Sequence, residues 1–188
     1  MKKKNRLKIT GGKYRGRILK IIDHYKIKPT KSFIREVLFN YLYIKIKNAK
    51  CLDCFSGSGI LGIESLSRNA SYVTFIDSEK KILEQIKKNT NLLFIKNCEL
   101  IHDNTLKWVY YCKKKYDVVF LDPPFYKNII NKIIHLLEKK NILNNNAYIY
   151  IEQEKKNIDV PSNWFLHKFK KSGLVYFFVY IRKKTKSL

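Results

Sequence analysis

The chain has 188 residues, which is long enough for one well-buried α/β domain. Its formal net charge of +24 favours a polyanionic partner such as nucleic acid. The basic excess comes from 33 Lys against 6 Arg, a pattern typical of codon drift, so the charge alone does not locate a binding surface. No secretory signal is expected, because charged residues interrupt any apolar segment after Lys4. No membrane span is expected, because the late apolar run at 174–181 is too short.

The first 45 residues differ in pattern from the rest and are predicted to be an appendage to the core. Residues 7–19 contain Gly11, Gly12 and Gly16 among basic residues, which predicts a basic hairpin turned by glycines. A helix is expected to follow from Pro29 to about Tyr43, with Thr30 as its N-cap. Because this segment has few apolar residues, the predicted division is 1–45 as the appendage and 46–188 as the main domain.

Strand-like and helix-like segments alternate from residue 50 onward. Strands are predicted at 51–55, 72–76, within 92–101, at 117–121 and at 147–151, and helices at 60–68, 79–91, 105–112 and 127–140. Residues 164–169 and 174–181 are expected to form an antiparallel hairpin around Gly173. This alternation, closed by a hairpin, predicts an α/β fold: a Rossmann-like, class I S-adenosylmethionine-dependent methyltransferase with a seven-stranded, mostly parallel sheet.

A glycine-rich turn follows the first strand of this alternation. Gly57, Gly59 and Gly62 match the G-x-G-x-x-G spacing that lets a backbone approach a nucleotide-bearing cofactor, and Asp77 is placed to accept hydrogen bonds from ribose hydroxyls. Asp53, just before the turn, favours S-adenosylmethionine over NAD. A pyrophosphate about 4 Å away would be repelled by on the order of 4 kcal/mol, whereas a sulfonium and an ammonium would be attracted.

The adenine-side contact is left open between two neighbours. Asp103 and Asn104 follow the third strand, and either could bond the adenine edge, although a helix cap explains Asp103 equally well. The four histidines have no metal-site spacing, so no metal is predicted. Cys51 and Cys54 form a C-x-x-C within a strand and are predicted to be buried, reduced thiols of a cytoplasmic protein.

The most informative motif is Asp122-Pro123-Pro124-Phe125, directly after an apolar strand. Asp122 and the Pro123 carbonyl can accept both hydrogens of an exocyclic NH₂, which frees the nitrogen lone pair for attack on a methyl group. Phe125 can stack on the base, and the prolines stiffen the loop. The motif therefore predicts catalysis at an amine on a nucleobase.

These features resemble the RsmD-type methyltransferases, which modify guanine N2 in bacterial 16S rRNA. The matching stretches lie within residues 9–17, 28–40, 52–64 and 122–125. The resemblance implies S-adenosylmethionine as methyl donor and a guanosine of 16S rRNA as acceptor, the one conventionally numbered 966, in the small ribosomal subunit or its assembly intermediate.

The resemblance further implies that the N-terminal segment contacts rRNA. The protein is also expected to be a cytoplasmic monomer that does not bind a membrane. The expected RNA-contacting residues are Lys13, Arg15, Arg17, Lys28 and Arg35. Lys28 departs from the family, which usually has Arg there, and Asn104 aligns with the family's acidic adenine-side position.

Three other functions are weighed against this one. A DNA adenine-N6 or cytosine-N4 methyltransferase uses a similar loop, but it needs a target-recognition region for which this chain has no spare segment. A non-catalytic rRNA-binding assembly factor would not need both the Asp122 loop and the glycine turn. An NAD-dependent dehydrogenase conflicts with the position of Asp53.

Overall fold

A computed structural model of the chain describes residues 6–22, 29–123 and 129–184. Seven strands form one sheet in the order β5-β4-β3-β6-β7-β9-β8. Their bounds are β3 Lys50–Asp53, β4 Tyr72–Asp77, β5 Cys98–His102, β6 Tyr116–Leu121, β7 Leu143–Gln153, β8 Trp164–Ser172 and β9 Val175–Arg182. The first five are mutually parallel, and β9 runs antiparallel to both β7 and β8. The predicted fold class and its closing hairpin are confirmed.

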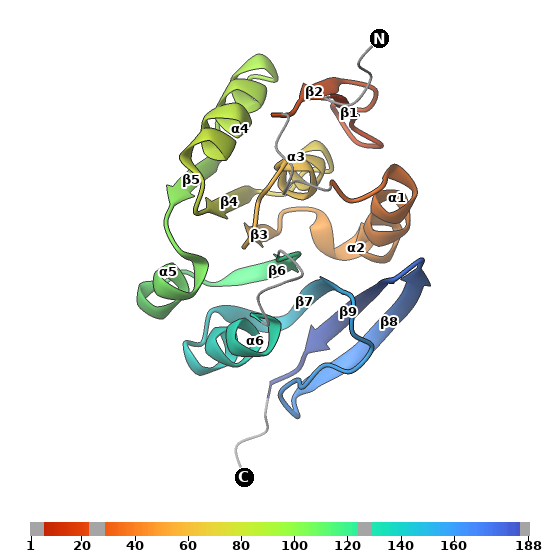
Figure 1. Cartoon of the computed structure of the whole chain (residues 1–188), viewed down its shortest axis with the longest axis vertical. Helices are drawn as coiled ribbons and strands as arrows, with labels where there is room; N and C mark the ends of the chain where they lie inside the picture. The colour runs from red at the N-terminus through yellow and green to blue at the C-terminus, as the bar shows by residue number, and fades with distance from the viewer. Residues whose placement is uncertain (1–5, 23–28, 124–128, 185–188) are drawn as a thin grey trace.

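Helices cover both faces of this sheet (Figure 1). One face carries α1 (Ser32–Tyr41), α2 (Tyr43–Ile46), α3 (Ile60–Ser67) and α4 (Lys80–Leu92), and the other carries α5 (Thr105–Tyr111) and α6 (Ile130–Lys139). Side chains of β6 alternate between the two cores: Val118 and Phe120 join the first, and Val119 and Leu121 join the second. A strand buried on both faces has to be a continuous apolar run, which is the pattern of β6.

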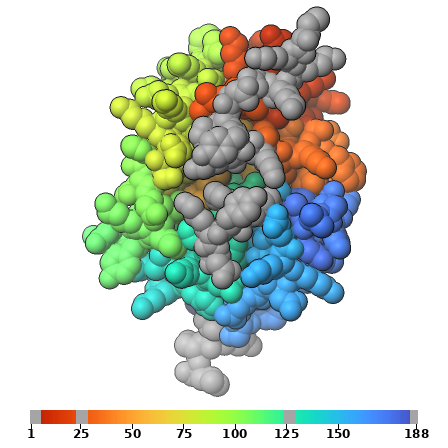
Figure 2. Space-filling model, viewed as in Figure 1, coloured from red at the N-terminus to blue at the C-terminus, as the bar shows by residue number. Residues whose placement is uncertain are grey.

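The N-terminal hairpin is layered onto the first core. Strands β1 (Arg6–Lys8) and β2 (Ile18–Lys20) pair antiparallel, as predicted. Ile9 and Leu19 are almost completely buried in the cluster that also contains α3 and α4. Figure 2 shows the hairpin (red) beside α4 (yellow-green) at the top of the molecule, and Asn89 of α4 bonds both the amide and the carbonyl of Lys20.

Two local expectations need correction or refinement. Thr30 is not an N-cap: α1 begins at Ser32, its N-cap is Lys31, and no side chain bonds the first turn. The Thr30 hydroxyl is directed instead to Asp122 Oδ2, at 3.5 Å, because a distant strand end supplies an acceptor. The strand predicted within residues 92–101 is β5, and it begins only at Cys98. Helix α4 continues to Leu92, and Phe94 then turns the chain with a φ of 55°.

The cysteine prediction agrees with the structure, in which Cys51 and Cys54 are buried and free. None of the helices in the described ranges has the length and apolar character needed to cross a bilayer.

Candidate active site

Acidic side chains gather where the order of the parallel strands reverses. Strands β3 and β6 are neighbours, with Asp53 paired to Phe120, so Asp122 lies just beyond the same end of the sheet. Asp77 ends β4 on one side, and Glu152 lies near the end of β7 on the other. The connections from β3 and β6 leave this point in opposite directions, and open α/β sheets bind their ligands at such a reversal.

The glycine turn between β3 and α3 presents its backbone toward Asp77. Gly57 and Gly59 have positive φ values of 47° and 71°, a conformation that residues with a Cβ rarely adopt. The Gly57 amide donates to Asp77 Oδ2 at 2.9 Å, and the Glu79 amide donates to Oδ1 at 3.0 Å. Burial raises the pKa of Asp77, and these two hydrogen bonds oppose the rise. Asp77 is therefore held rigidly and remains partly exposed, as a contact to a ribose would require.

Asp53 is the most buried acid at this edge, with an exposed fraction of 3%. Its Oδ2 accepts from the Gly62 amide at 3.3 Å. Burial raises the pKa of Asp53 to about 7, the Gly62 hydrogen bond lowers it, and the charge on Asp77 raises it further. Gly62 itself serves packing: a Cβ there would lie 2.1 Å from the Phe75 ring, so only glycine lets α3 approach β4 this closely.

Asn104 and Asp103 follow β5 at the same edge of the sheet. The Asn104 side-chain oxygen accepts from the Lys107 amide at 3.2 Å and caps α5. The Asp103 carboxylate accepts from the Asn104 amide at 2.7 Å. The Asn104 side chain is exposed, and its NH₂ group remains able to donate to a ligand. Neither residue is singled out as the adenine contact.

The catalytic candidates lie beside two residues that sequence reasoning did not identify. Asp122 is partly exposed and Pro123 is buried, whereas Phe125 falls outside the described residues. Glu152 is 7% exposed and accepts from the Tyr150 hydroxyl at 3.0 Å.

These two carboxyl groups influence each other. Burial raises the pKa of Glu152 to about 7. Burial also raises the pKa of Asp122 well above its usual range, with the charges on Glu152 and Asp53 adding to the rise. Hydrogen bonding to Thr30 lowers both pKa values.

The charge balance of this cluster fits a cationic ligand. Within the described ranges, none of Asp53, Asp77, Asp122 and Glu152 forms an ion pair with a basic side chain. Buried carboxylates without a counter-charge are unfavourable unless a ligand supplies one. A molecule with a sulfonium and an ammonium group would supply that charge next to Asp53, and its ribose would meet Asp77. The residues present therefore fit S-adenosylmethionine.

The predicted RNA-contacting residues separate into two groups. Lys13, Arg15 and Arg17 are exposed on the hairpin, where phosphates could reach them. Arg35 is 2% exposed, so its prediction as an RNA contact is wrong. Its guanidinium donates to Glu64 Oε1 at 2.9 Å and to the Lys8 carbonyl at 3.1 Å, because α1 buries this side chain against α3 and the hairpin. Lys28 lies outside the described residues.

Glu64 is another residue whose role the sequence did not indicate. It is completely buried in α3 and binds the guanidinium groups of both Arg35 and Arg68. It also accepts from the Thr10 amide at 2.9 Å and from the Thr10 hydroxyl at 2.8 Å. The motif Leu61-Gly62-Ile63-Glu64 contained a weak signal, an acid inside a largely apolar helix. Glu64 therefore joins the hairpin to the helix that follows the glycine turn.

Comparisons with known proteins agree with this arrangement. A family model described as "Conserved hypothetical protein 95" matches residues 7–181. "Ribosomal RNA small subunit methyltransferase D" of Buchnera aphidicola (subsp. Acyrthosiphon pisum) is 43% identical, over 96% of this chain and 95% of that protein. Its Escherichia coli K12 counterpart is 38% identical, over 97% and 96%. The solved structure of "Putative methyltransferase yhhF" from Escherichia coli superimposes with a TM-score of 0.89 at 37% identity, covering 95% of this chain and 98% of that one.

Proposed function

The chain belongs to the RsmD family of S-adenosylmethionine-dependent rRNA methyltransferases, and on this premise we propose that it methylates the exocyclic N2 amine of a guanosine in 16S rRNA. Its relatives are named for the small ribosomal subunit, so the proposed substrate is the small subunit or an assembly intermediate of it. The guanosine conventionally numbered 966 is the proposed target, by family resemblance.

One observation supports this reaction above the others. Asp53 and Asp122 lie at the ends of two adjacent strands, β3 and β6, so a cofactor site and an amine-binding loop open onto the same point. S-adenosylmethionine, when bound, supplies an electrophilic methyl group on a positively charged sulfur. The proposed roles of Asp53 and Asp77 are to hold the charged end and the ribose of this cofactor, with Asn104 on the adenine side.

Asp122 has two proposed tasks toward the substrate amine. Its carboxylate accepts one hydrogen of the NH₂ group and the Pro123 carbonyl accepts the other, which directs the nitrogen lone pair toward the methyl donor. Burial and Glu152 raise the pKa of Asp122, so its carboxylate is a better proton acceptor than an exposed aspartate. The proton released by the methylated amine can therefore pass to Asp122. The proposed part of Phe125 is to stack on the guanine.

The RNA-binding part of the proposal rests on the exposed hairpin residues Lys13, Arg15 and Arg17. Glu64 ties this hairpin to α3, so phosphates held by the hairpin would be fixed relative to the cofactor site. Lys28 stays in the proposal on the resemblance alone.

Nucleoside mass spectrometry tests the reaction directly. Purified small subunits that lack the modification are incubated with the protein and S-adenosylmethionine, and the 16S rRNA is then digested. We expect N2-methylguanosine at a single site. N6-methyladenine on duplex DNA with no rRNA product would favour a DNA methyltransferase, and rRNA binding without any methylated product would favour an assembly factor.

A further inference from the structure

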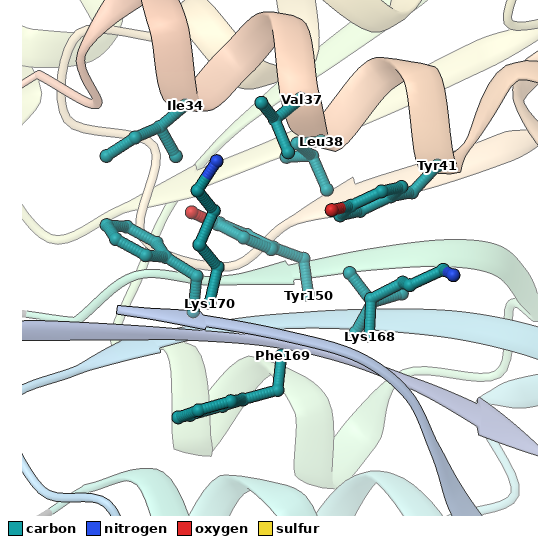
Figure 3. Close-up of a pocket in the computed structure, with 10 residues that line it drawn as sticks. Ile34, Val37, Leu38, Tyr41, Tyr150, Lys168, Phe169 and Lys170 are labelled. Atoms are coloured by element: carbon teal, nitrogen blue, oxygen red, sulfur yellow. The ribbon is translucent and has the colours of Figure 1, made fainter. Parts of the chain in front are cut away.

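A narrow groove with an interior of about 20 Å³ lies between helix α1 and the C-terminal strands β8 and β9 (Figure 3). Its walls are mainly apolar and aromatic, with two lysines and no acidic side chain. The lining residues that matter here are Tyr41, Tyr150, Lys168 and Lys170, with Ile34 and Phe177 among the apolar walls.

Lysines of β8 and aromatic side chains of α1 form pairs along this groove. Figure 3 shows Lys168 and Lys170 pointing toward α1, whereas Phe169 between them points to the opposite face of the sheet. Lys170 Nζ lies 4.3 Å from the centre of the Phe33 ring, and Lys168 Nζ lies 5.5 Å from that of Tyr41. Phe33 does not line the groove itself but lies next to Lys170 at its edge, and it is 57% exposed although it is large and apolar. The groove thus combines cations with accessible aromatic rings.

The floor of the groove is connected to the candidate active site. Tyr150 lines the groove and is almost completely buried, and its hydroxyl donates to Glu152 at 3.0 Å. The segment that leads into α1 contains Thr30, whose hydroxyl lies 3.5 Å from Asp122. The inner end of the groove therefore borders the carboxyl cluster proposed to hold the target amine.

We propose that the edge of this groove, formed by Lys168, Lys170 and the adjacent Phe33, binds a single-stranded segment of the substrate RNA that flanks the target nucleotide, an inference that rests on the proposed function. Single-stranded nucleic acid is bound by positively charged grooves whose aromatic side chains stack with bases. Lys168 and Lys170 would contact phosphates, and Phe33 would stack with a base once Lys170 turns from the ring to a phosphate. An enzyme that presents one base to a buried loop needs contacts to the neighbouring nucleotides to hold that base out.

The chain contains a matched control for this proposal. On the opposite face of the sheet, Lys140 Nζ lies 3.5 Å from the ring of Tyr110, which is 52% exposed. This pair belongs to α5 and the end of α6, which join the second core, away from α1. It therefore reproduces the cation–aromatic chemistry and the exposure of the groove pair without its proximity to Asp122.

The test compares Phe33→Ala and the double variant Lys168→Gln/Lys170→Gln with Tyr110→Ala and Lys140→Gln. Binding to purified small subunits is measured over a series of salt concentrations, independently of methyl transfer. We expect each groove variant to weaken binding about 5-fold or more, with base stacking worth about 1–3 kcal/mol. The lysine variant should also reduce the slope of log K against log [salt] by about 1.4, since each single-strand phosphate contact contributes about 0.7. The control variants should bind as the unaltered protein does.

Three results would overturn the proposal. The first is that the groove variants bind small subunits as tightly as the unaltered protein does. The second is that the control variants lose as much affinity as the groove variants. The third is weaker binding with an unchanged salt slope in the lysine variant, which would assign the groove to a protein partner. Thermal unfolding of each variant shows whether a loss of binding comes from misfolding. The variant Lys168→Arg/Lys170→Arg should restore the slope of log K against log [salt]. If the unaltered protein binds subunits through the groove but methylates nothing, the proposed function fails while RNA binding at the groove stands.

Discussion

The guanidinium of Arg35 in α1 donates to the carboxylate of Glu64 in α3 at 2.9 Å, and both side chains are almost completely buried. Glu64 also binds Arg68 and Thr10, so one carboxylate connects α1, α3 and the N-terminal hairpin. Truncating one partner of such a pair leaves an uncompensated buried charge. This network explains how a short hairpin with few apolar residues is held on the core.

Replacing Arg35 should affect stability and leave the salt dependence of RNA binding unchanged. Arg35→Met leaves Glu64 with one fewer counter-charge, and we expect a loss of about 3–5 kcal/mol in the free energy of unfolding, measured by urea titration. The triple variant Lys13→Gln/Arg15→Gln/Arg17→Gln should instead change the salt dependence of RNA binding and leave stability nearly unchanged. It should retain stability within about 1 kcal/mol and reduce the slope of log K against log [salt] by about 2, at about 0.7 per contact. A reduced slope in Arg35→Met with normal stability would contradict the structural role of Arg35.

Gly12 should be far less replaceable than Gly16, although both lie in the same hairpin with positive φ values of 77° and 84°. A Cβ on Gly12 would lie 1.9 Å from the Ser67 carbonyl oxygen, whereas a Cβ on Gly16 would meet only Lys8, at 4.0 Å. Gly16→Ala should cost about 1–2 kcal/mol of stability, the penalty for a left-handed residue. Gly12→Ala should cost clearly more and should weaken rRNA binding, because the hairpin has to move off α3. Similar losses in both variants would argue against close contact between Gly12 and α3.

Removing the Asp122 carboxylate should strongly slow methyl transfer while rRNA binding persists. Asp122→Asn keeps the shape of the side chain but loses the negative charge and the proton acceptor. We expect kcat to fall by about 100-fold or more. Single-turnover methylation of small subunits measures the chemical step, and filter binding measures the affinity. Retention of near-normal kcat would show that the amine acceptor has been assigned to the wrong residue.

The affinity for S-adenosylmethionine should rise with pH as Asp53 loses its proton. The raised pKa values, about 7 for both Asp53 and Glu152, mean that these groups are largely protonated below that pH in the free protein. A cationic cofactor requires ionised Asp53, so the affinity for S-adenosylmethionine should increase between about pH 6 and pH 8. Isothermal titration calorimetry across this range checks the trend. An affinity that does not change with pH would contradict the proposed contact of Asp53.

The stability of the free protein should change with pH in the opposite direction. Because these carboxyl groups hold protons in the folded state that they release when unfolded, stability falls as pH rises from about 4 to about 7. Asp53→Asn removes one of these groups. We therefore expect it to raise the melting temperature at pH 8, by roughly 2–4 °C per kcal/mol recovered, while weakening cofactor binding. A lower melting temperature at pH 8 would mean that Asp53 stabilises the fold when ionised.

The sequence by itself determined the features that depend on neighbouring residues. The glycine turn at 57–62, the Asp122 loop after an apolar strand, the basic hairpin and the alternation of strands and helices are all local patterns, and the structure bears out the elements that they predict within the described residues. Asp53 could be identified because it ends a strand directly before a glycine turn, a position that faces the ligand in folds of this type.

Only the tertiary structure decided which polar groups share an environment. Thr30 and Asp122 are 92 residues apart, and Arg35 and Glu64 are 29 apart, so neither pair leaves a periodic signal in the chain. Thr30 reads locally as a helix cap and Arg35 as a surface cation until α1 packs against the sheet and α3. Glu152 becomes a neighbour of Asp122 only when β7 pairs with β6. Burial and pKa depend on this long-range packing, and local sequence patterns contain no information about it.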